Sequence, residues 1–136
     1  MNETSAFEAM MVAVRDTIVW PPGAAYPAVV KENTDFSGAK EYVLVCVEPG
    51  RSEQRTQGTR GARTWKRPGT LVFAIHVPLG IGTSRARELA DAIRTSLEGE
   101  KIGGVIYRAM SDMDKGKTKS HYYLVVGLVF EYYEHK

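Results

Sequence analysis

The stretch Tyr122-Tyr123-Leu124-Val125-Val126-Gly127-Leu128-Val129-Phe130 decides the fold, and it lies within a strand that we predict for residues 120–133. Side chains alternate between the two faces of a strand. One face here carries Tyr122, Leu124, Val126, Leu128 and Phe130, and the other carries Tyr123, Val125 and Val129. Strands that are apolar on both faces belong to sheets that are covered on both sides, whereas a sheet with one wet face alternates apolar with polar residues.

The segments before this strand supply further strands. The strand predicted for residues 40–48 is also apolar on both faces, because Tyr42, Leu44 and Cys46 alternate with valines. Alternating or apolar runs predict two more strands at residues 70–79 and 102–110, and a short edge strand around residues 28–30. Glycine, proline and charged residues separate these runs, as expected for turns and loops.

Apolar residues at helical spacing predict two helices. The first covers residues 4–20, where Ser5 and Glu8 have the spacing of a capping box, and a proline pair ends it. The second runs from an N-cap at residue 83 or 84 to residue 97, with Gly99 as the C′ residue. The order of elements is therefore helix, two strands, helix, two strands.

We therefore predict an α+β fold in a single domain of residues 1–136: a four-stranded, mainly antiparallel sheet with two helices packed on one face. Residues 49–69 form a long basic hairpin loop, and residues 112–119 form a second hairpin loop. Two helices cover one face of such a sheet and little more. The other face needs the long loops or a second copy of the chain to cover it.

Composition excludes several classes of protein. The chain has 136 residues, 43% hydrophobic and 25% charged, which is ordinary for a globular domain. The single cysteine, Cys46, excludes a disulfide-stapled scaffold, and the three histidines are too scattered for a zinc cage. The longest apolar run falls far short of the ~20 residues of a membrane helix, and we expect no signal peptide and no membrane contact.

No motif predicts catalysis, a cofactor or a metal. Gly80-Ile81-Gly82 lacks the third glycine of a dinucleotide fingerprint, because Arg85 stands in its place. Gly116-Lys117-Thr118 resembles the end of a phosphate-binding loop, but a strand follows it where that loop needs a helix. Cys46 lies between valines as an inert core residue would, and His76 is expected to be packed in a strand with one nitrogen satisfied.

Charge is concentrated in one segment, which is the candidate binding site. Residues 51–67 hold six basic residues and one acidic residue, a net charge of +5, so the rest of the chain carries −3 of the total of +2. The candidate partner-binding residues are Arg51, Arg55, Arg60, Arg63, Trp65, Lys66 and Arg67. Such a segment fits an acidic protein face or nucleic acid, where the arginines would neutralise phosphates and Trp65 would stack on a base. A solvated hairpin tip that only aids solubility is the third interpretation.

The chain resembles the lambda-type tail terminator (tail completion) proteins of long-tailed phages over nearly its whole length. The similar stretches are the first helix ending in Trp20-Pro21, the strand Glu41-Tyr42-Val43-Leu44-Val45, the long basic hairpin, residues 69–78, Gly80-Ile81-Gly82-Thr83-Ser84, residues 86–93 and residues 123–131. The likeness rests on the order of these elements and the general character of their sequences, and not on a diagnostic motif.

The resemblance implies a structural virion protein without enzymatic activity or cofactor. Such proteins form six-subunit rings that cap the tail tube, end its polymerisation and offer a surface to the head connector. The implied partners are further copies of the chain, the tail tube protein, a head-completion or connector protein and, transiently, genomic DNA. The implied location is the head-proximal end of the tail, after synthesis in the host cytoplasm. The alternatives are a head–tail connector ring and a small nucleic-acid-binding module that uses the basic hairpin.

Overall fold

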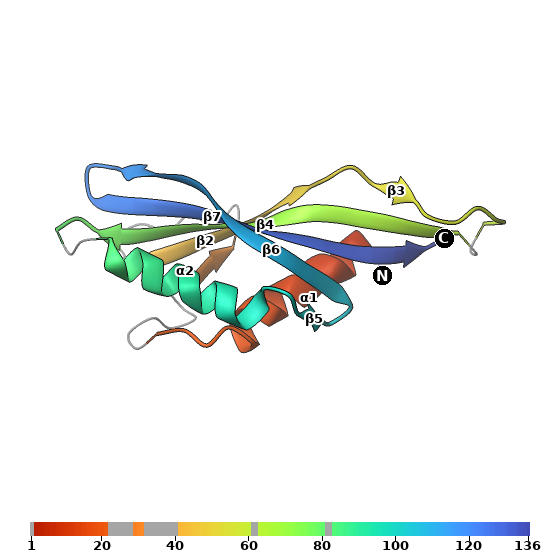
Figure 1. Cartoon of the computed structure of the whole chain (residues 1–136), viewed down its shortest axis with the longest axis horizontal. Helices are drawn as coiled ribbons and strands as arrows, with labels where there is room; N and C mark the ends of the chain where they lie inside the picture. Colours follow the sequence, from red (N-terminus) through yellow and green to blue (C-terminus); the bar gives the residue numbers. More distant parts are fainter. Residues whose placement is uncertain (1, 22–28, 32–40, 61–62, 81–82) are drawn as a thin grey trace.

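Two long strands at the centre of the sheet organise the fold. In the computed structural model, which describes residues 2–21, 29–31, 41–60, 63–80 and 83–136, β4 (Thr64–Pro78) pairs with β7 (His121–His135) over all fifteen residues of each strand. The pairing is antiparallel and runs from Thr64 opposite His135 to Pro78 opposite His121. Figure 1 shows this ribbon running through the whole length of the molecule.

The other described strands add to both sides of this pair. On one side lie β2 (Tyr42–Pro49), antiparallel to β4, and then β1 (Val29–Lys31), parallel to β2. On the other side lie β6 (Val105–Lys117), antiparallel to β7, and then β5 (Lys101–Ile102). The order is β1-β2-β4-β7-β6-β5, with the two-residue β3 (Glu53–Gln54) paired to β4 off this path. The α+β class is confirmed, but the prediction of four strands is wrong, because the described strands make a sheet of seven.

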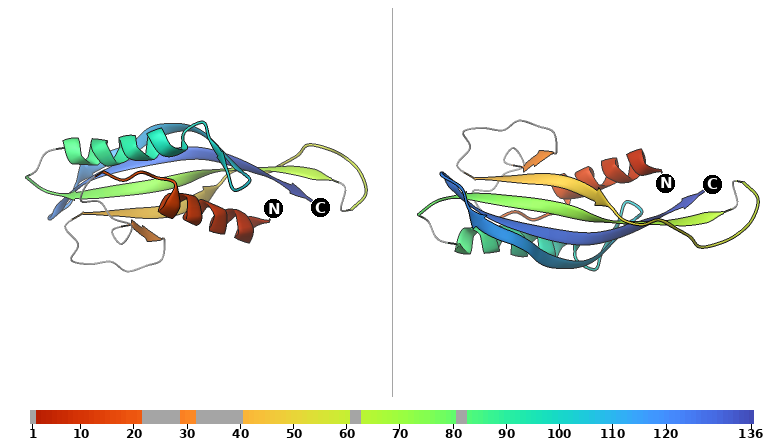
Figure 2. Two further views of the ribbon diagram at one scale, coloured as in Figure 1. Left: turned by 90° about the horizontal axis from the view of Figure 1, so that it is seen from below. Right: turned by 90° about the horizontal axis from the view of Figure 1, so that it is seen from above.

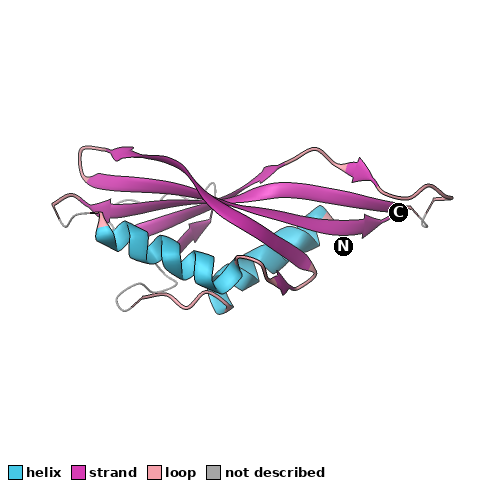
Figure 3. Ribbon diagram, viewed as in Figure 1, coloured by secondary structure: helices cyan, strands magenta, loops and turns pink. Residues whose placement is uncertain are grey.

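Both helices lie on one face of the strongly twisted sheet, as the sequence predicts (Figures 2 and 3). α1 (Glu3–Asp16) and α2 (Ser84–Leu97) bury Met10, Val14, Leu89 and Ile93 against the strands. The strands contribute every second residue to this core, namely Val43 and Val45 from β2, Leu71, Phe73, Ile75 and Val77 from β4, and Leu124, Val126, Leu128 and Phe130 from β7. At roughly 25 cal/mol per Å² of buried apolar area, this layer is the main source of stability.

The opposite face of the sheet carries no helix in the described part of the chain. Leu44 and Val125 are half-buried there, while Val129 and Met113 are 43% and 49% exposed. Cys46 also lies on this face, opposite Val72, and is only half-buried, so the prediction that it is a core residue is wrong.

The boundaries of α1 differ from the prediction at both ends. Asn2, not Ser5, is the N-cap: Ser5 N–H donates to Asn2 Oδ1 at 2.8 Å, and Asn2 N–H donates to Ser5 Oγ at 3.0 Å. Ser5 is therefore the N3 residue of the capping box, the role that the sequence analysis gives to Glu8. The helix ends at Asp16, so residues 17–20 are not helical. For α2, Thr83 is the N-cap, and Gly99 follows the helix with φ +81°, which confirms it as the C′ residue.

Strands extend into both predicted hairpin loops, over part of residues 49–69 and over most of residues 112–119. β4 begins at Thr64, although the sequence predicts a loop up to residue 69, and β6 continues to Lys117, although the sequence predicts a loop from residue 112. Two register shifts interrupt the pairing of β6 with β7, one between Tyr107 and Met110 and one between Asp112 and Asp114. The remaining prediction, an edge strand around residues 28–30, corresponds to β1.

Replacing Asn2 by alanine removes the acceptor for Ser5 N–H, so we expect the free energy of unfolding to fall by about 1 kcal/mol. Urea unfolding followed by circular dichroism measures this. Asn2→Asp keeps an oxygen at the same position and serves as the control, with a change of about a few tenths of a kcal/mol. Equal losses in both variants would contradict the assignment of Asn2 as the cap.

Candidate interaction arm and groove

The β4–β7 ribbon extends past the helices as an arm, which we define as residues 51–60, 63–68 and 132–136. Figures 1 and 2 show it projecting beyond α1 at the end of the molecule that carries the C-terminus. β3 pairs with β4 through Glu53 and Gln54, and Arg55 N–H donates to Thr64 O at 2.7 Å. The prediction of a long loop is therefore wrong for residues 53–54 and from Thr64 onward, where the backbone polar groups are paired in strands, whereas residues 55–60 are not in a strand.

Strand alternation sorts the side chains of the arm onto two faces. Trp65 and Arg67 lie opposite Glu134 and Tyr132 and share the helix side of the sheet with the buried Phe130. Lys66 lies opposite Tyr133 and therefore points to the other side. The candidate binding residues, which the sequence places in one basic segment, are thus divided between two surfaces.

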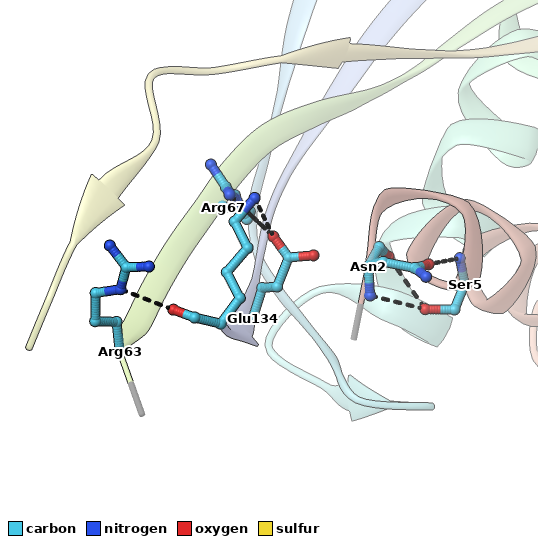
Figure 4. A network of polar contacts seen from close by, with 6 residues as sticks. Asn2, Ser5, Arg63, Arg67 and Glu134 are labelled. Carbon is cyan, nitrogen blue, oxygen red and sulfur yellow. Dashed lines mark hydrogen bonds and ion pairs between the residues drawn. The ribbon is translucent and has the colours of Figure 1, made fainter. Parts of the chain in front are cut away.

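On the helix side, the basic residues of the arm are paired with an acidic one. Arg67 Nη2 lies 2.9 Å from Glu134 Oε1, and Lys136 Nζ lies 3.8 Å from the same oxygen (Figure 4). The Arg67 guanidinium also stacks over the Trp65 ring, 5.0 Å from its centroid, where a cation and the face of an indole attract each other. The indole Nε1 of Trp65 is buried and has no hydrogen-bond partner among the described residues.

On the other side, Glu131 lies where the arm joins the body, and its side chain is 8% exposed. Arg108 Nε donates to Glu131 Oε1 at 2.7 Å, Tyr133 OH donates to Oε2 at 2.9 Å, and Lys66 Nζ lies 3.9 Å from Oε2. The hydrogen bond from Arg108, with help from Tyr133 and Lys66, holds the pKa of this carboxyl below its usual value, although burial opposes the shift. The network ties strands β4, β6 and β7 together at one point.

The remaining basic residues of the arm are more open to solvent. Arg55 lies 3.7 Å from Glu53, and Arg63 Nε donates to the carbonyl oxygen of Lys136 at 3.1 Å (Figure 4). Arg51 and Arg60 are exposed and make no ion pair with a described residue. Among the candidate residues that the structure describes, these two arginines are the most open to a partner, and the charge of Arg63 also has no carboxylate side chain beside it.

A groove of about 830 Å³ lies under the root of the arm, against the start of α1. Its apolar floor includes Phe7, Phe130 and Tyr132, and the rings of the last two stack with centroids 6.4 Å apart. Gly69 makes room for Phe130, because a Cβ there would lie 2.6 Å from Phe130 Cζ. The rim is polar and carries Asn2, Glu3, Arg67, Glu134 and Lys136. An aromatic floor with a charged rim is a surface suited to protein contact.

The other residues that the sequence singles out lie apart from the arm. His76 Nδ1 lies 3.2 Å from Ala74 O, and its ring stacks on Tyr42 with centroids 4.4 Å apart, so the prediction of a packed histidine with one satisfied nitrogen is confirmed. Desolvation lowers the pKa of His76. Of the glycine motif before α2, Ile81 and Gly82 lie outside the described residues. Among the described residues, no cluster of three or more His, Cys, Asp or Glu side chains could hold a metal, and no helix could span a membrane.

Sequence reasoning missed the acidic partners of the basic segment. Glu131 and Glu134 lie near the end of the chain, more than sixty residues from Lys66 and Arg67. The available signal was the alternation of Glu131 and Tyr133 with Phe130, Tyr132 and Glu134, which places acids on both faces of the last strand. This signal identifies the partners of Lys66 and Arg67 only when the register of β4 against β7 is known.

No family model matches the sequence, and no curated protein matches it. Eleven chains of solved structure are similar to it. One of them is 18% identical and superposes with a TM-score of 0.68, over 97% of this chain and 96% of that chain. At this level of identity the likeness shows a shared fold.

We expect the free energy of unfolding of the chain to decrease as the pH is lowered, partly because of Glu131. A carboxyl whose pKa is lowered by folding contributes stability above its unfolded pKa of about 4.3, and this contribution is lost as the pH falls through the folded pKa. Glu131→Gln should therefore unfold more easily than the parent chain at pH 7, and the gap should narrow at pH 3. Urea unfolding at both pH values measures it.

Glu100→Gln is the control for this experiment, because the Glu100 side chain is exposed and makes no ion pair with a described residue. Its free energy of unfolding should follow that of the parent chain at both pH values. A gap between parent and Glu131→Gln that stays constant with pH would contradict the role of the charged carboxylate.

Proposed function

We propose that the chain is a structural protein of a phage tail, a terminator that forms a ring at the end of the tail tube. The observation that carries the proposal is the arm: a paired ribbon that leaves the body and presents charged and aromatic side chains beyond it. The sequence resemblance to lambda-type tail terminators supports the same function. The ring would stop polymerisation of the tube and offer a surface to the head-completion or connector protein, and this role requires no catalytic centre.

The arm and the groove suit head-to-tail association. A ring of identical subunits needs two different surfaces on each chain, because every copy contacts one neighbour with each. The exposed tip of the arm, which carries Arg60, is one such surface, and the groove at the root of the arm, which carries Phe130 and Tyr132, is the other. Aromatic and arginine side chains are the kind that dominate interface energies. The partly exposed apolar residues Val129 and Met113 on the helix-free face add a third surface for a neighbouring copy or for the tube.

Within the arm, the charges favour protein over nucleic acid as the partner. Arg55, Lys66 and Arg67 each lie within 4 Å of a carboxylate of the same chain, so half of the six basic candidate residues already have an acidic partner. The exposed Arg51 and Arg60 keep open the second candidate, a nucleic-acid-binding module that uses the arm. A head–tail connector ring, which needs the same kind of surfaces, is the other alternative.

Self-association is the first test of the proposal. We expect native mass spectrometry of the purified chain, alone or with tail tubes, to show a defined oligomer, and a hexamer in particular. Apolar area on the helix-free face and the groove would drive it. A chain that stays monomeric at high concentration and also fails to bind tail tubes would show that the proposal is wrong.

Charge reversal at the arm is the second test. Arg60→Glu should block tail completion while it changes the free energy of unfolding by no more than ~0.5 kcal/mol, because Arg60 is exposed. The matched control is Lys101→Glu, an exposed reversal on β5 away from the arm. The assay is tube length and head joining by electron microscopy with the tube protein present. Normal completion by Arg60→Glu would contradict a role of the arm tip in assembly.

A further inference from the structure

The turn between β6 and β7 is a second basic surface, at the opposite end of the molecule from the arm (Figure 1). Lys115, Lys117 and Lys119 lie here within five residues, and all three are exposed. We call residues 115–120 the lysine turn. In the sequence analysis this segment resembles only the end of a phosphate-binding loop, and β7 follows it where such a loop needs a helix.

The lysine turn keeps its charge, in contrast to much of the arm. None of its three lysines forms an ion pair with a described residue. The neighbouring acid, Asp114, uses Oδ1 to accept the backbone N–H of Lys115 at 2.8 Å. In the arm, by contrast, four of the basic residues, Arg55, Lys66, Arg67 and Lys136, are each within 4 Å of a carboxylate of the same chain.

The lysine turn is held by its own contacts and by its neighbours. The Tyr123 ring lies across Gly116, where a Cβ would come within 2.5 Å of the Tyr123 hydroxyl oxygen. Thr118 Oγ1 accepts the backbone N–H of His121 at 3.0 Å, and Leu79 N–H donates to Ser120 O at 3.2 Å. The lysines therefore project from an ordered hairpin end, so little backbone entropy is lost when they meet a partner.

We propose that the lysine turn binds the phosphate backbone of a nucleic acid. Lys115 and Lys117 are alternate residues of β6 and share one side of the strand, about 6.6–6.8 Å apart along it, so each can meet a separate phosphate. Lysine neutralises phosphate as a point charge and needs no fixed geometry. Residues 115–120 contain no apolar side chain, whereas a protein interface is built around buried apolar or aromatic anchors.

The proposal is independent of the proposed ring, because its test requires only the purified full-length chain. Fluorescence anisotropy measures binding of a labelled duplex DNA and of a labelled single strand at several salt concentrations. The test variant is Lys115→Gln/Lys117→Gln/Lys119→Gln. The matched control, Arg51→Gln/Arg55→Gln/Arg60→Gln, removes the same number of charges from the arm. All six positions are exposed, and circular dichroism checks that both variants fold.

We expect the lysine variant to lose at least tenfold in affinity for duplex DNA at low salt. The slope of log K against log salt should fall in magnitude by about 2–3, because each lost phosphate contact contributes about 0.9. The arm variant should stay within about twofold of the parent. The proposal would be overturned if the parent chain did not bind DNA, or if the arm variant lost as much affinity as the lysine variant or more. It would also be overturned if polyglutamate, added as a competitor, displaced the labelled DNA as well as unlabelled DNA does.

Discussion

The antiparallel ladder between β4 and β7 is the constraint on which the rest of the structure depends. It joins Thr64 to His135 at one end and Pro78 to His121 at the other. In its central part, alternate residues of both strands face the helices and form the core. Toward the arm, the same ladder continues without helices beneath it. A single pairing thus produces both the stable body and the projecting surface.

The root of the arm needs a second interaction, because a two-stranded ribbon is only marginally stable in water. The Glu131 carboxylate supplies it by accepting hydrogen bonds from Arg108 on β6 and Tyr133 on β7, with Lys66 of β4 nearby. A nearly buried charge is tolerated when it is paired and hydrogen-bonded in this way. On the opposite face, Arg67 and Glu134 join the same two strands, so the ribbon is cross-linked by charge on both sides.

The sequence predicts the apolar parts of this fold well and the polar parts poorly. The apolar run of residues 122–130 correctly predicts a strand, and Gly99 correctly marks the end of the second helix. For the first residues of β4 and the last of β6 the sequence predicts loops, because Thr64, Lys66 and Lys115 show no apolar period. Backbone hydrogen bonds to a neighbouring strand form without an alternation of apolar side chains, so these strand ends can be recognised only from the register of pairing. The same limit applies to the candidate site, where pairs such as Arg67 with Glu134, 67 residues apart, decide which charges of the basic segment are neutralised.

The two register shifts of β6 have a consequence for how copies of the chain can meet. Beyond its short pairing with β5, much of this strand is an outer edge of the sheet in the described part of the chain. An edge whose register shifts twice and that carries Asp112, Asp114 and Lys115 is a poor template for another strand. Open-ended growth of the sheet into fibres through this edge is thereby discouraged, even when the chain is concentrated.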